Sequence, residues 1–180
     1  MKTLRQTLLL LAIVAVGISA AAQEADPVIA SIRQAYDQAW QVIKRGDKNA
    51  RNEMVSTLKY QVPGSGQVTE TFRFFSRLEV FGENNEFTNY ALYFVTRQYK
   101  IAGRKYYEEY LFNRHSTPIF VFKQGYDEAG KKTEKRLYYQ NGTIYRVVGE
   151  LTETYEAEIS YAYATEFRQA FDNLIRNAKE

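Results

Sequence analysis

The sequence lacks cysteine altogether and contains one histidine, His115, among its 180 residues. The absence of cysteine excludes disulfides and zinc sites built from thiolates. A single histidine excludes a multi-histidine metal site, and no Gly-x-Ser-x-Gly stretch accompanies His115 as a serine hydrolase would require. We therefore expect no metal, no cofactor and no catalytic residue, and an exposed His115 in the connection between Asn113 and Pro118.

A charge excess of one sign is also missing. The chain has 24 basic and 21 acidic residues, a formal net charge of +3, and the two signs are interleaved along its length. A nucleic-acid-binding protein usually carries a basic patch or stripe. We therefore do not expect nucleic acid among the partners.

Long apolar runs are absent except near the N-terminus. Lys2 and Arg5 precede an apolar run from Leu8 to Ile18, and small residues follow up to Ala22. This order is typical of a secretory signal peptide, and the alternative is a retained N-terminal anchor. We predict cleavage of residues 1–22, a single domain over residues 23–180 with no transmembrane segment, and a periplasmic or extracellular location.

The hydrophobic period predicts an α+β fold. Asp26 and Pro27 suit a helix start and Gly46 an end, and apolar residues recur every three or four positions between them, which predicts a helix over 28–45. From Glu53 to Val148 the period becomes two. The predicted strands lie at about 53–62, 72–80, 87–100, 104–112, 119–123, 134–140 and 143–148.

The C-terminal part has an ambiguous beginning, because residues 152–163 fit a strand as well as a helix. No Gly, Pro or Asn interrupts residues 150–172, which favours one long helix from about 153. We interpret its glutamates as a solvated helix start; they are Glu150, Glu153, Glu156 and Glu158. The predicted architecture is an antiparallel meander of about seven strands with both helices on one face of the sheet.

The adjacent pair Glu108 and Glu109 invites a catalytic interpretation, but neighbouring residues on a strand point to opposite faces. If Ala102-Gly103 is a two-residue hairpin loop, Arg97 lies opposite Glu108. We predict a structural ion pair between Arg97 and Glu108, with Glu109 on the more polar side.

Asn141-Gly142 is a strong signal for a second tight hairpin. A two-residue loop there would place Tyr138 opposite Tyr145, with Arg136 beside them. Two rings and a guanidinium could bind a ligand, although a cross-strand pair that only rigidifies the hairpin is the alternative. We predict Tyr138, Tyr145 and Arg136 as ligand-binding residues.

The leader and the tyrosine-rich segments "RKYYEEYLF" and "KRLYYQNGTIYRVV" resemble small exported proteins of Gram-negative bacteria. The resemblance implies a periplasmic or surface location and transfers no functional residue. We expect a non-catalytic binding or interaction module that uses an aromatic sheet face. Its candidate partners are a glycan, an apolar small molecule or an envelope protein. The alternatives are a glycan hydrolase with a carboxylate pair assembled by the fold, and a structural protein of the envelope that associates with itself as a homodimer.

Overall fold

A computed structural model describes residues 26–46, 52–82, 87–149 and 155–177. By its internal contacts the chain divides into two units, residues 1–35 and 36–180. The predicted signal peptide lies outside the described residues. The element bounds are α2 Pro27–Arg45, β1 Asn52–Val62, β2 Gly66–Phe81, β3 Phe87–Ile101, β4 Arg104–Phe112, β5 Pro118–Tyr126, β6 Lys132–Gln140, β7 Thr143–Val148 and α3 Glu156–Asn177.

The first unit contributes the start of α2. The Asp26 carboxylate accepts hydrogen bonds from the backbone N–H groups of Val28 (3.0 Å) and Ile29 (3.3 Å). These bonds satisfy donors that the first helical turn leaves free. The predicted start of the helix is confirmed to within one residue.

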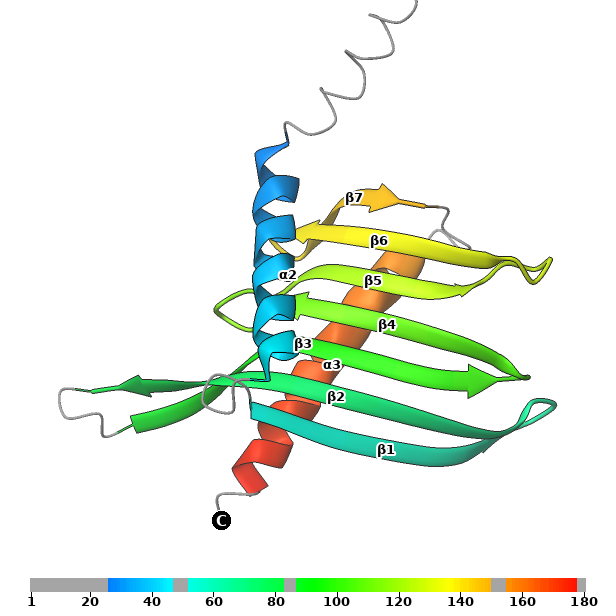
Figure 1. Ribbon diagram of the computed structural model, residues 1–180, viewed down its shortest axis with the longest axis horizontal. Helices are drawn as coiled ribbons and strands as arrows, with labels where there is room; N and C mark the ends of the chain where they lie inside the picture. The colour runs from blue at the N-terminus through cyan, green and yellow to red at the C-terminus, as the bar shows by residue number, and fades with distance from the viewer. Residues whose placement is uncertain (1–25, 47–51, 83–86, 150–154, 178–180) are drawn as a thin grey trace, which may run out of the picture. The chain divides into compact units, whose positions relative to one another are not determined.

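The second unit contains one seven-stranded antiparallel sheet in sequence order, β1 to β7, so the predicted meander is confirmed (Figure 1). Both predicted two-residue hairpin loops are present. Ala102 and Gly103 have φ values of 48° and 82°, and Asn141 and Gly142 have φ values of 53° and 81°. Positive φ at both positions gives the turn the twist of the flanking strands.

Helix α3 and the part of α2 that belongs to the second unit, residues 36–45, lie against opposite faces of the sheet, so the prediction that both helices share one face is wrong. Phe167 of α3 packs on Tyr110 with ring centroids 4.9 Å apart, whereas Trp40 of α2 packs on Phe94 at 5.4 Å. Tyr110 pairs with Val95, the residue next to Phe94, and adjacent residues of a strand point to opposite faces of the sheet. The run Ala91–Val95 is buried throughout, as expected for a strand covered on both sides.

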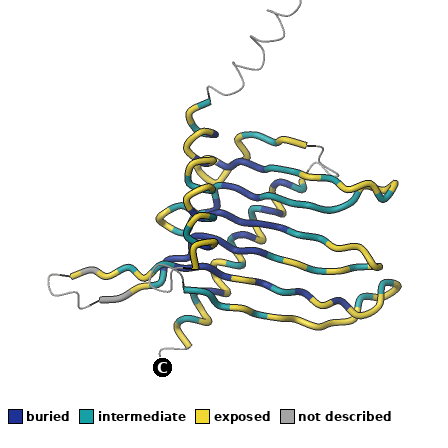
Figure 2. Tube along the Cα trace, in the orientation of Figure 1, coloured by how far each residue is buried: buried dark blue, intermediate teal, exposed yellow. Residues whose placement is uncertain are grey.

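Helix α3 crosses the sheet diagonally (Figure 1). Its buried residues include Ala157, Ser160 and Ala164, whose small side chains allow a close approach to the strands. Residues 156–163 are helical, which resolves most of the ambiguous stretch, while residues 150–154 lie outside the described residues. In β4, β5 and β6 the buried residues gather toward one end of each strand, the C-terminal end of β4 and β6 and the N-terminal end of β5, and exposure rises toward the other end (Figure 2).

Candidate ligand-binding site

The neighbouring glutamates of β4 point to opposite faces, as predicted. Glu108 accepts hydrogen bonds from Arg97 Nη1 (3.0 Å) and from the hydroxyl of Tyr110 (2.5 Å). Glu109 accepts hydrogen bonds from the hydroxyls of Tyr36 (2.6 Å) and Tyr107 (2.7 Å). The prediction that Glu109 lies on a more polar side is wrong, because Glu108 and Glu109 are 3% and 4% exposed.

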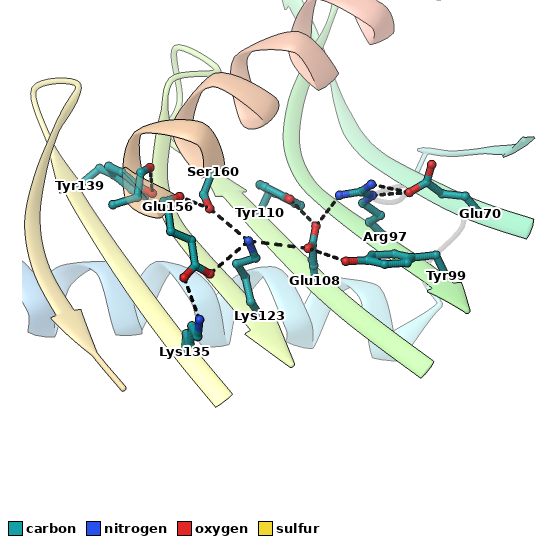
Figure 3. A network of polar contacts seen from close by, with 11 residues as sticks. Glu70, Arg97, Tyr99, Glu108, Tyr110, Lys123, Lys135, Tyr139, Glu156 and Ser160 are labelled. Carbon is teal, nitrogen blue, oxygen red and sulfur yellow. Dashed lines mark hydrogen bonds and ion pairs between the residues drawn. The ribbon is translucent and has the colours of Figure 1, made fainter. Parts of the chain in front are cut away.

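The predicted Arg97–Glu108 ion pair is present and belongs to a larger set of charges. The hairpin register places Arg97 directly opposite Glu108, and the next two strands place Lys123 and Lys135 in the same row. We call six residues on the α3 face the charge network: Glu70, Arg97, Glu108, Lys123, Lys135 and Glu156 (Figure 3). It contains three acids and three bases, so its formal charges cancel.

Arg97 is held at the centre of this network. Its guanidinium lies 2.5 Å from Glu70 and 3.0 Å from Glu108, and it stacks over the Tyr99 ring at 4.6 Å. Burial disfavours its charged form, but the two carboxylates outweigh burial and raise the pKa of Arg97 above its ordinary value. The guanidinium therefore remains charged.

Burial also affects the tyrosine hydroxyls that donate to the network. Burial, and next the charge of Glu108, raise the pKa of Tyr110 well above its usual value, and the same causes raise the pKa of Tyr99. Each ring therefore stays protonated and acts as a hydrogen-bond donor at neutral pH.

Lys123 connects the sheet to the start of α3. Its ammonium lies 3.9 Å from Glu108, 3.4 Å from Glu156 and 3.4 Å from the hydroxyl of Ser160. Lys135 lies 2.7 Å from Glu156. The sequence suggests that Glu156 belongs to a solvated helix start, and this interpretation is wrong, because its side chain is only 14% exposed and contacts two lysines.

A pocket of about 160 Å³ opens beside these charges. Its charged lining residues are Glu108, Lys123, Lys135 and Glu156, and its aromatic ones are Tyr99, Tyr106 and Tyr126. The first two rings stack with centroids 4.9 Å apart and an interplanar angle of 6°, and Tyr126 meets Tyr106 edge-on at 5.7 Å. The pocket therefore offers flat apolar surfaces next to fixed charges of both signs.

Gly125 permits this arrangement of rings. A Cβ atom added at Gly125 would lie 3.2 Å from the Tyr106 ring, closer than ordinary contact. Because glycine lacks that atom, Tyr106 can lie over β5. Glycine within a strand often marks such a close approach.

The three residues predicted to bind a ligand do not form a common platform. A bulge between Tyr138 and Tyr139 shifts the register, so Tyr138 lies opposite Arg146 and the predicted pairing with Tyr145 is wrong. Tyr138 is 2% exposed and packs on Phe120 at 5.1 Å, whereas Tyr145 is 41% exposed. Arg136 lies over the Phe122 ring at 5.3 Å and pairs with Glu134.

His115 lies exposed in the connection after β4, as predicted, and its Nε2 accepts a hydrogen bond from Arg114 Nε at 3.0 Å.

No cluster of three or more potential metal ligands occurs among the residues that the structure describes. None of the helices in the described ranges contains an apolar stretch of sufficient length to span a bilayer.

Sequence reasoning did not include four members of the charge network: Glu70, Lys123, Lys135 and Glu156. One signal for Lys123 was present, because the alternation of β5 places it on the same face as the buried Val121.

Comparison of the chain with protein-family models, curated proteins and solved structures returned no match. The proposal for its function therefore rests on the geometry of the site.

Proposed function

We propose that the protein binds a small hydroxyl-rich ligand, such as one sugar ring of a glycan, in the pocket formed by Tyr99, Tyr106 and Tyr126. The observation that supports the proposal is that three tyrosine rings and four charged side chains line the same pocket. The C–H face of a sugar ring can pack on an aromatic ring, while its hydroxyls can donate to Glu108 or Glu156 and accept from Lys123 or Lys135.

An apolar small molecule fits this pocket less well. Four of its lining residues carry formal charge. Covering them with an apolar surface would remove water from charged groups without replacing its hydrogen bonds, which costs free energy. A hydroxyl-rich ligand replaces those hydrogen bonds.

A glycan hydrolase is also less consistent with these contacts, although two carboxylates do face one pocket. The general acid of a glycosidase must hold a proton. Glu108 contacts Arg97 and Lys123, and Glu156 contacts Lys123 and Lys135. Both carboxylates are therefore held in ion pairs with basic side chains, and we propose binding without turnover.

The test is a titration of the purified protein with a panel of mono- and oligosaccharides, followed by calorimetry and thermal unfolding. A ligand at about 100 times its dissociation constant should stabilise the fold by about 2.7 kcal/mol. Tyr126→Ala should weaken binding by tenfold or more, since it removes one ring of the wall.

Tyr145→Ala is the matched control, because Tyr145 is an exposed tyrosine on β7 that does not line the pocket. Equal losses in the two variants, or no binding by any saccharide, would refute the proposal. Release of shortened glycan during incubation would instead identify a hydrolase.

We also propose that the protein acts outside the cytoplasm, based on residues 1–22. Expression in a Gram-negative host, fractionation and N-terminal sequencing would test this proposal. A mature chain that begins at Gln23 in the periplasm or medium is the expected result, and an intact Met1 on cytoplasmic protein would contradict it.

A further inference from the structure

The sheet ends at β1, and within the described residues no strand pairs with its outer edge. β1 is eleven residues long, whereas β7 at the opposite edge has six. Val55, Leu58 and Tyr60 on β1 are 54%, 50% and 39% exposed. A long edge strand with exposed apolar side chains is a ready template for pairing with another strand.

The geometry of antiparallel pairing limits how two copies of β1 could meet. Alternate residues of an edge strand turn their N–H and C=O groups outward. A twofold axis must therefore pass through one residue, so that outward groups meet outward groups. The number of paired residues is large only when the axis lies near the middle of β1, so few residues qualify.

Charge selects one of these registers. With the axis at Ser56, Glu53 lies opposite Lys59 of the second copy, and Met54 lies opposite Leu58. Glu53 faces no cation of the second copy when the axis lies at Val55, Thr57 or Leu58. When the axis lies at Lys59, the two copies of Lys59 face each other. An edge lysine usually discourages pairing, but in this register it meets an acid.

The contacts around Glu53 and Met54 support the same register. Glu53 pairs with Arg73 of β2 at 3.0 Å, so Lys59 of a second copy would complete a row of alternating charges. Met54 packs against the core cluster of the sheet. An opposing Leu58 would extend that apolar contact across the edge.

We propose that two copies of the chain form a dimer by antiparallel pairing of their β1 strands about a twofold axis at Ser56. The dimer continues the sheet from one copy into the next. This interface uses the edge farthest from β7 and does not depend on the ligand pocket.

The absence of cysteine makes a direct test available, since each single-cysteine variant carries one thiol. In the proposed register Ser56 faces Ser56 of the second copy at the Cα separation of directly opposite residues, which a disulfide can bridge. Thr57 of one copy lies diagonal to Thr57 of the other, about 7 to 8 Å away, which is too far for a disulfide.

The experiment oxidises full-length Ser56→Cys and Thr57→Cys under the same mild conditions and compares them on a non-reducing gel. We expect Ser56→Cys to form a covalent dimer in most molecules and Thr57→Cys to form it in a small minority. Equal cross-linking of the two variants would overturn the register.

Light scattering of the unmodified chain supplies the second measurement. The mass should equal two chains, and Lys59→Glu should halve it. Adding Glu53→Lys to Lys59→Glu restores an opposite-charge pair and should restore the dimer. A monomer at all concentrations, or a double variant that stays monomeric, would overturn the proposal.

Discussion

The two adjacent glutamates of β4 provide the sharpest prediction, because they are equally buried but have different neighbours. Glu108 contacts two cations, Arg97 and Lys123, whereas Glu109 contacts two tyrosine hydroxyls. Glutamine has nearly the same shape as glutamate and no charge. Glu108→Gln and Glu109→Gln therefore test the charge of each side chain with little change in packing.

Glu108→Gln should be strongly destabilising. Among the residues that the structure describes, it leaves Arg97 with Glu70 and Lys123 with Glu156 as the remaining acidic neighbours. Breaking a buried ion pair by removing one partner costs about 3 to 5 kcal/mol. Because each cation keeps one carboxylate, we expect a loss near the lower end, about 3 kcal/mol.

Glu109→Gln should change stability by less than about 1 kcal/mol. Among the described residues, no Lys or Arg lies within ion-pair distance of Glu109, so burial of its charge is not offset by a cation. The amide oxygen can still accept hydrogen bonds from Tyr36 and Tyr107. These bonds weaken when the acceptor is neutral, but the cost of burying a charge disappears.

Urea unfolding at neutral pH measures both values. Trp40 is the only tryptophan and packs against Phe94, so its fluorescence reports loss of the folded sheet. With a slope of about 1 to 3 kcal/mol per molar urea, Glu108→Gln should lower the midpoint by about 1 to 3 M. A midpoint loss for Glu109→Gln equal to that for Glu108→Gln would refute the explanation by cation contacts.

Three further predictions concern other features of the fold. The pKa of Tyr110 is raised in the folded state, so the free energy of unfolding should hold below pH 10 and fall above it, by up to about 1.4 kcal/mol per pH unit for each such tyrosine. Tyr110→Phe should reduce this dependence of stability on pH, measured by urea unfolding at several pH values. Gly149→Ala should lower the melting temperature more than Gly64→Ala, because only at Gly149 would the new Cβ meet a backbone oxygen, 2.5 Å away on Glu134. Asp26→Ala should cost helix α2 about 1 kcal/mol, observed as faster amide exchange in its first turn.

Local signals in the sequence determined the order of elements and the pairing of β3 with β4. Ala102-Gly103 is a two-residue loop, so the position of the turn alone fixes which residues face each other. For that reason the contact between Arg97 and Glu108 could be predicted without any knowledge of the rest of the fold. The divergence of Glu108 and Glu109 followed from the period of a strand.

Only the tertiary structure decided which faces are covered and how far each charge is buried. The register of the second hairpin shifts by one residue between Tyr138 and Tyr139, so Tyr138 lies opposite Arg146 and not opposite Tyr145. Such a shift changes every partner beyond it. Glu156 meets Lys123 and Lys135 because α3 returns to the sheet many residues later. Such contacts depend on packing between distant segments, which no local spacing of residues encodes.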